Sequence, residues 1–288
     1  MRSHSTPAVL LLAVWMACPA VAGAQANSQE SFLDSDGVRI RYVVRGAGHP
    51  VVLVHGFMVN TELNWVGPGI LDSLAAHYTV IALDLRGHGA SDKPHDPSAY
   101  GTAFVDDVVR LLDHLEIQRA HVVGYSMGGA ITLKLLSTHP HRVASAVLGG
   151  FGWRSPERGP AEGVIQLRAQ VERVARGETT LADVLAASDS IALTPQMRVA
   201  LNRNDLDALR AVQAGEGELR NVPQAYLRAN TVPVLAIVGE RDWARPDVEQ
   251  MAEVMSNLDV EIIPGATHVT AVAHPLFLGS MLEFLRSR

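Results

Sequence analysis

Residues 124–128 read Gly-Tyr-Ser-Met-Gly, which is the G-x-S-x-G pattern, and they end a short apolar run that begins at His121. Where this pattern joins a strand to a helix, its serine sits on a strained, tight turn, so the residues two positions before and after it must be small. Gly124 and Gly128 meet that requirement. The pattern and its context predict that Ser126 is a nucleophile, and the alternative is an incidental serine in a glycine-rich turn.

A serine hydroxyl needs two partners to react at neutral pH. A base must take its proton and later return it to the leaving group, and histidine has a suitable pKa for this task. A carboxylate must then fix the tautomer of the imidazole and stabilise the imidazolium. The chain has 12 histidines, so the base has to be chosen by position.

The elements that position the serine are predicted from apolar runs that end in glycine or a polar residue. Runs of this kind, without alternation, are typical of parallel strands that are covered on both faces. They occur at Val51 to His55, Thr79 to Asp84, His121 to Tyr125, Val143 to Gly149, Val234 to Val238 and Val260 to Ile263. Before them, the turn residues 34–37 between two apolar alternations predict an antiparallel hairpin.

Helical spacing of apolar residues predicts the crossover helices. These are expected at Asp72 to His77, at Ala103 to Leu115, from Met127 onward and at Leu276 to Leu285. Residues 152–229 are rich in arginine, glutamate and alanine, with helical periodicity and no strand-like run. The sequence therefore predicts an α/β core, residues 27–151 and 230–288, that is interrupted by a helical cap at 152–229.

Residues 1–26 have the pattern of a secretory signal peptide. A basic start and an apolar run at 8–17 precede small residues at 22–24 and 26, and the run is too short to cross a bilayer as a stable helix. We expect cleavage after Ala24 or Ala26 and export to the periplasm or the medium. The alternatives are a retained apolar anchor, or lipid attachment at Cys18, although residues 15–17 do not resemble a lipoprotein signal. As the one cysteine lies in this segment, the mature chain should hold no disulfide.

Composition limits the partners. With 48% hydrophobic and 19% charged residues the chain has enough apolar area for a globular core. A formal charge of −6 gives no basic surface for nucleic acid. The sequence has no metal-ligand spacing of cysteine and histidine and no nucleotide-binding glycine motif. We expect no metal, no cofactor and no stable membrane insertion, and a monomer or a homodimer that acts on a small molecule.

From about residue 31 to its end, the chain resembles the α/β-hydrolase superfamily. The resemblance rests on the serine motif, on His55-Gly56-Phe57, on residues 84–92 (DLRGHGASD) and on residues 239–242 (GERD), each after an expected strand. It implies a mostly parallel eight-stranded sheet with helices on both faces and an inserted helical cap. Similar cap-bearing members include esterases, carbon–carbon bond hydrolases, cofactor-free haloperoxidases and epoxide hydrolases, and the last of these attack with aspartate where this chain has Ser126.

The resemblance assigns the base and the acid. Family members carry their histidine after the last strand, which is the position of His268, with His274 as the alternative. Asp242 stands in the Ser, Asp, His order of the fold. Weaker alternatives for the acid are Asp247 and Glu157.

Family geometry assigns the two oxyanion donors to the backbone amides of Phe57 and Met127. Large apolar side chains near the catalytic loops predict a substrate pocket formed by Met58, Trp65, Phe151, Trp153 and Trp243. We therefore expect a serine hydrolase that cleaves small to medium carboxylic esters through an acyl-enzyme. The same triad would serve a carbon–carbon bond hydrolase, a lactonase or a perhydrolase, and a receptor-like binding protein is the non-enzymatic alternative.

Overall fold

The computed structural model describes residues 30–189 and 191–288. The predicted signal peptide and Cys18 lie outside the described residues. Eight strands form one sheet in the order β1-β2-β4-β3-β5-β6-β7-β8. The strands are β1 (Ser31–Ser35), β2 (Val38–Arg45), β3 (Pro50–Val54), β4 (Thr79–Leu83), β5 (Ala120–Tyr125), β6 (Val143–Gly149), β7 (Val234–Gly239) and β8 (Leu258–Ile263).

Strand β2 runs antiparallel to both of its neighbours, β1 and β4, whereas β4, β3, β5, β6, β7 and β8 pair in parallel. The predicted hairpin at the start and the mostly parallel sheet are both confirmed. Each of the six apolar runs forms a strand, with ends that lie within two residues of the predicted ones.

Helices cover both faces of the sheet. They are α1 (Ile70–Ala75), α2 (Ala103–His114), α3 (Met127–Thr138), α9 (Arg245–Val254) and α10 (Pro275–Arg286). Successive residues of a strand face opposite sides, so Val52 and Val54 of β3 join the core under α2, α3 and α9, while Val51 and Leu53 join the core under α1 and α10. The sheet is thus buried on both sides, which explains the continuous apolar runs in its strands.

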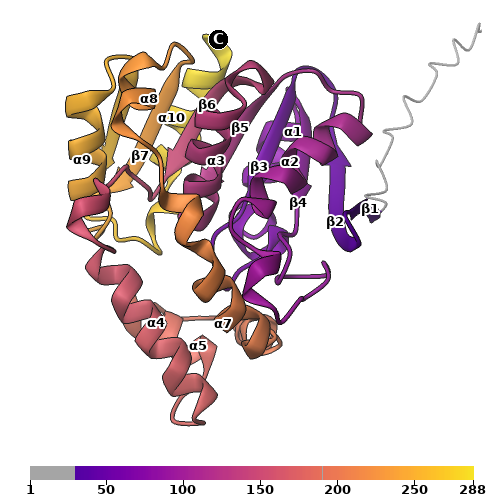
Figure 1. Ribbon diagram of the computed structural model, residues 1–288, viewed down its shortest axis with the longest axis vertical. Helices are drawn as coiled ribbons and strands as arrows, with labels where there is room; N and C mark the ends of the chain where they lie inside the picture. Colours follow the sequence, from indigo (N-terminus) through magenta and orange to yellow (C-terminus); the bar gives the residue numbers. More distant parts are fainter. Residues whose placement is uncertain (1–29, 190) are drawn as a thin grey trace, which may run out of the picture.

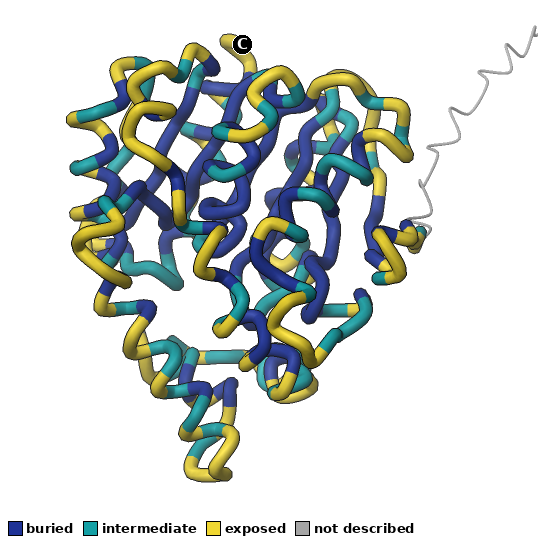
Figure 2. Tube along the Cα trace, in the orientation of Figure 1, coloured by how far each residue is buried: buried dark blue, intermediate teal, exposed yellow. Residues whose placement is uncertain are grey.

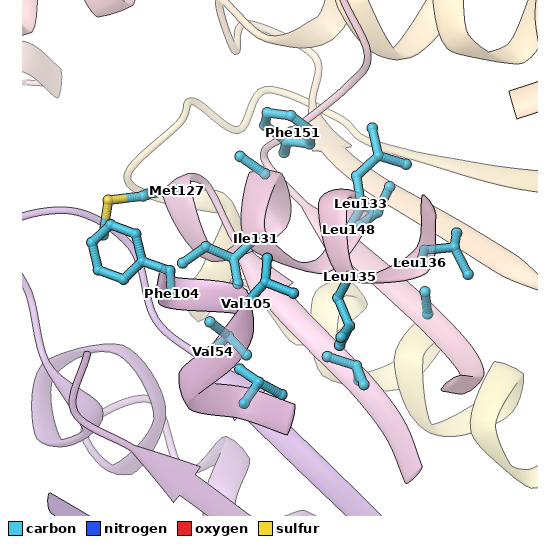
Figure 3. Packing of buried hydrophobic residues seen from close by; sticks show 14 of the residues in the cluster. Val54, Phe104, Val105, Met127, Ile131, Leu133, Leu135, Leu136, Leu148 and Phe151 are labelled. Carbon is cyan, nitrogen blue, oxygen red and sulfur yellow. The ribbon is translucent and has the colours of Figure 1, made fainter. Parts of the chain in front are cut away.

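The helix that follows the predicted nucleophile is held by the first of these cores. Figure 3 shows Phe104 and Val105 of α2 beside Met127 and Ile131 of α3, all of them buried in one cluster. These apolar contacts hold the start of α3 in place, and they therefore also hold the turn between β5 and α3.

Between β6 and β7 the chain forms helices that include α4 (Glu162–Ala175), α5 (Leu181–Asp189), α6 (Pro195–Asn202), α7 (Leu206–Gly215) and α8 (Gln224–Ala229). Helices α4, α5 and α7 lie at the lower end of the molecule in Figure 1, and more of their surface is exposed than in the sheet (Figure 2). Val171, Leu181 and Leu201 form a small apolar cluster there with Met58. Helix α8 instead packs beside α9 of the main body. The boundaries 152 and 229 of the cap stay a prediction.

Among the elements that were not predicted from the sequence, two lie near the predicted catalytic residues. Residues Glu62–Val66 form a single π-helical turn after β3, and α9 follows β7 directly. Both lie next to the residues that could do chemistry.

Candidate active site

Ser126 lies on the turn between β5 and α3 with φ of 54° and ψ of −111°. Its backbone N–H donates to the carbonyl of Gly149 over 2.8 Å. A Cβ atom at Gly124 would lie 2.1 Å from the carbonyl oxygen of Gly128, and one at Gly128 would lie 2.0 Å from that of Val54. Both glycines are required because backbone atoms occupy the space that a side chain would need.

His268 and Asp242 meet Ser126 at the carboxyl edge of the sheet. The Nε2 atom of His268 lies 2.9 Å from the Oγ atom of Ser126. The Nδ1 atom of His268 lies 2.9 Å and 3.0 Å from the two carboxylate oxygens of Asp242. An ionised carboxylate only accepts hydrogen bonds, so Nδ1 carries the imidazole proton and Nε2 can accept the proton of the serine hydroxyl. The side chain of Asp242 is fully buried.

The alternative acids and base lie elsewhere. Asp247 is paired with Arg154 over 2.7 Å. Glu157 is exposed and accepts a hydrogen bond from Ser155. The Nδ1 atom of His274 accepts from the amide of Leu276 and caps α10. The structure therefore brings Ser126, His268 and Asp242 together and leaves these other residues outside the cluster.

Two aromatic residues hold His268 in place. The Tyr125 hydroxyl donates to the carbonyl oxygen of His268 over 2.6 Å. The ring centroid of Trp243 lies 4.5 Å from that of His268. Packing and a backbone hydrogen bond thus both limit the motion of the imidazole.

The loop that carries Phe57 passes beside the nucleophile. A Cβ atom at Gly56 would lie 3.4 Å from the Cβ atom of Ser126. The amide of Gly56 donates to Oδ1 of Asn64 over 2.9 Å. Met127 follows Ser126 as the first residue of α3, and Phe57 follows Gly56, so both residues are next in the chain to groups that lie beside the nucleophile. Their role as oxyanion donors stays a prediction.

His55 also holds the loop that carries Phe57, through two contacts of its imidazole. Its Nδ1 atom is 2.7 Å from the carbonyl oxygen of Gly56, and its Nε2 atom accepts from the amide of Leu85 over 3.0 Å. These contacts define a neutral imidazole that donates from Nδ1. Burial lowers the pKa of His55, with a smaller opposing effect from the charge of Asp84. Asn64 positions this loop as well, through its hydrogen bond to Gly56. It could not be identified from the sequence, because no motif marks it.

A cavity of about 440 Å³ contains Ser126 and His268. Helices α5 and α6 cover it on the cap side through Leu185, Met197 and Leu201. The remaining walls are mostly apolar and include Phe57, Val59, Leu63, Val269 and Val272. Among the described residues that line this cavity there is no lysine or arginine, and Glu62 is the one carboxylate. A neutral, apolar group fits this chemistry.

The predicted pocket residues need correction, because none of the five lines this cavity. Trp65 is fully buried in the core under α1 and α10. Met58 is buried in the apolar cluster beneath the cap helices. Phe151, Trp153 and Trp243 line a different cavity. Closeness in sequence to a catalytic loop did not determine which way each side chain faces, and in the π-helical turn Leu63 and Asn64 face the cavity while Trp65 faces the core.

Two features are absent from residues 30–189 and 191–288. No group of three or more histidine, cysteine, aspartate or glutamate residues in this part of the chain is placed to hold a metal ion. None of its helices is both long and apolar enough to span a membrane.

The sequence and the fold resemble those of known proteins. Residues 49–275 match the family described as alpha/beta hydrolase fold. The chain is 35% identical over 225 residues to the dihydrolipoyllysine-residue acetyltransferase component of the acetoin cleaving system of Cupriavidus necator, covering 75% of this chain and 58% of that protein. It is 40% identical over 116 residues to 2-hydroxymuconate semialdehyde hydrolase of a Pseudomonas species, covering 40% of each chain. A solved hydrolase from Pseudomonas aeruginosa superposes with a TM-score of 0.71 at 27% identity, covering 91% of this chain and 99% of that one.

Proposed function

The chain belongs to the alpha/beta hydrolase family, and from this premise we propose that it is a serine hydrolase that cleaves neutral carboxylic esters with an apolar acyl group. The observation that carries the proposal is the continuous hydrogen-bonded line from Asp242 through His268 to Ser126, with the serine hydroxyl inside an apolar cavity.

The reaction begins when the Oγ atom of Ser126 attacks the ester carbonyl and His268 takes the hydroxyl proton at Nε2. Asp242 stabilises the imidazolium that forms. The carbonyl oxygen becomes an oxyanion, and the amides of Phe57 and Met127 donate to it together with the positive end of α3. His268 then gives its proton to the departing alkoxide, which leaves an acyl-enzyme at Ser126. Water then attacks the acyl carbon while His268 takes a proton from it. The bond between that carbon and the Oγ atom of Ser126 breaks, His268 returns the proton to Oγ, and the carboxylic acid is released.

The cavity supports the choice of substrate. A desolvated carboxylate would have no lysine or arginine to pair with among its described lining residues, and burying an unpaired charge is costly. An apolar acyl group gains about 0.8 kcal/mol for each buried methylene. A neutral ester of small or medium size is therefore favoured over an anionic substrate and over a long triglyceride.

Carbon–carbon bond hydrolysis is the second candidate, because the same triad can perform it and the chain shares 40% identity over 116 residues with 2-hydroxymuconate semialdehyde hydrolase. The apolar lining of the cavity ranks it below ester hydrolysis.

The test is the hydrolysis of p-nitrophenyl esters from acetate to decanoate by wild type, Ser126→Ala and a control, Ser137→Ala, which changes a serine of α3 outside the cavity. Loss of the nucleophile should lower kcat roughly a million-fold with unchanged thermal melting, and the control should keep wild-type activity. More than a tenth of wild-type turnover in a folded Ser126→Ala variant would refute the proposal, as would the absence of turnover in wild type.

A further inference from the structure

A second cavity, of about 390 Å³, lies between the main body and the start of the cap helices. Among the described residues, none lines both this cavity and the one at Ser126. Trp243 forms one of its walls, and the same indole lies against the imidazole of His268. The second cavity is thus separate from the reacting atoms but only one side chain away from them.

Three aromatic side chains give this cavity apolar walls: Phe151, Trp153 and Trp243. The indole N–H of Trp153 donates to the carbonyl of Val222 over 2.7 Å, so its polar atom is satisfied and its ring is fixed. Aromatic walls of this kind favour a flat or apolar body through burial and ring stacking.

The charged groups of the same cavity are mostly positive. Arg154, Arg168 and Arg220 line it, and Asp247 is the one carboxylate among its described lining residues. Asp247 already accepts from Arg154 over 2.7 Å. Glu216 does not line the cavity but accepts hydrogen bonds from two of these arginines. Its Oε1 atom accepts from Arg168 over 3.0 Å, and its Oε2 atom accepts from Arg220 over 3.2 Å. Three arginines are thus paired with only two carboxylates, so this group of side chains carries a net positive charge.

Two guanidinium donors in this group lack a partner. The Nε atoms of Arg168 and Arg220 are buried and make no hydrogen bond within the described residues. These Nε atoms have no accessible surface, so a ligand in the cavity would contact other parts of the two guanidinium groups, whose side chains are 43% and 31% exposed. A carboxylate is the acceptor that arginine pairs with best.

We propose that this second cavity binds an organic carboxylate with an aromatic or apolar body, the charged group at Arg168 and Arg220 and the body against Phe151, Trp153 and Trp243. The site differs in charge from the cavity at Ser126, where no arginine or lysine is found among the described lining residues. The two cavities would thus bind different ligands. The cavity at Ser126 would bind a neutral ester, and the second cavity would bind an organic anion.

Benzoate is the probe, and its neutral isostere benzamide is the matched ligand. Binding is measured by calorimetry on the Ser126→Ala protein, so that no reaction can contribute and the result does not depend on esterase activity. Benzoate should bind at least tenfold more tightly than benzamide. Trp153 and Trp243 line the site, so benzoate should also change the tryptophan fluorescence.

Three variants in that background locate the site. Arg168→Leu combined with Arg220→Leu should weaken benzoate at least tenfold, since each lost charged hydrogen bond costs a factor of this size. Arg158→Ala removes a nearby arginine that does not line the cavity and should bind like the parent. Val272→Trp narrows the cavity at Ser126 and should also bind like the parent. Equal affinity for benzoate and benzamide, unchanged binding in the double variant, or loss of binding in Val272→Trp would each overturn the proposal. Thermal melting of each variant confirms that it is folded, and the benzamide comparison needs no substitution in the cavity.

Discussion

The indole of Trp243 lies against the imidazole of His268, with ring centroids 4.5 Å apart and ring planes tilted by 34°. The indole also packs against helix α4, because a Cβ atom at Gly163 would lie 2.4 Å from its Cδ2 atom. Trp243 therefore contacts both helix α4 and the histidine of the triad. An aromatic ring in this place can stabilise the imidazolium that forms as Ser126 loses its proton.

Replacing Trp243 with leucine should lower kcat by about twofold to thirtyfold, because a cation–π contact contributes about 0.5 to 2 kcal/mol. Trp243→Phe should keep most of the activity. Steady-state kinetics on a soluble p-nitrophenyl ester measures the effect, and Trp153→Phe is the control, since Trp153 lines the second cavity. An unchanged kcat in the folded leucine variant would show that the ring contact has no catalytic effect.

Asp242→Asn should lower kcat roughly 10⁴-fold, because a neutral amide no longer enforces the proton on Nδ1 of His268. The control is Asp247→Asn, which changes another buried aspartate that pairs with Arg154 and not with the histidine. We expect the control to lose stability but to keep its activity per folded molecule. Equal losses of kcat in the two variants would argue against the assigned acid.

Asn64 positions the loop that carries Phe57, because it accepts the amide of Gly56. Asn64→Leu should lower kcat by about tenfold to a hundredfold, since a displaced oxyanion donor costs that much or more. KM should change little, and Asn64→Asp, which still offers an oxygen acceptor, should restore part of kcat. A rise in KM at constant kcat would mean that Asn64 only contacts the substrate in the cavity.

How far the sequence predicts this site depends on whether a residue acts through its own motif or through packing. Ser126 can be identified from its own motif and the turn glycines on either side of it, which are local properties of the sequence. Asp242 and His268 have no such motif and were assigned by the resemblance, from the order in which family members carry these residues after their strands.

The substrate cavity could not be predicted in the same way. Its cover comes from Leu185 and Leu201, whose helices are placed by contacts between distant segments. Trp65 is close to Phe57 along the chain, which predicts that it lines the pocket. A π-helical turn instead directs it into the core. Helix α9 was missed because only three of its ten residues are buried, so its apolar pattern is weak.

Low pH should destabilise the fold through His88. This imidazole is fully buried, and burial, helped by nearby His55, lowers its pKa to about 3 from 6.5. Between these two values the unfolded chain binds a proton that the folded chain does not, so the free energy of unfolding decreases as the pH falls below about 6.5. The expected slope from this group is about 1.4 kcal/mol per pH unit.

Urea unfolding between pH 6.5 and 4.5 measures that slope. His88→Phe should reduce it by about 1.4 kcal/mol per pH unit, whatever the substitution does to stability at neutral pH. The control is His141→Asn, which changes an exposed histidine and leaves the buried histidines His55 and His88 intact. A slope that is the same in wild type and His88→Phe would contradict the assignment.

Acyl-chain preference should depend on the cap residues that close the cavity at Ser126. Leu185 of α5 lines this cavity, whereas Trp153 lines the second one. In wild type, kcat/KM should rise about fourfold with each added acyl carbon, because a buried methylene contributes about 0.8 kcal/mol, and should peak below about ten carbons when the cavity is full. Leu185→Trp fills part of the space, so the peak should move to shorter chains while activity on the acetate ester is kept. Trp153→Phe should leave the peak where it is. If Trp153→Phe moves the peak and Leu185→Trp does not, the acyl group binds in the second cavity and the assignment of the two sites must be exchanged.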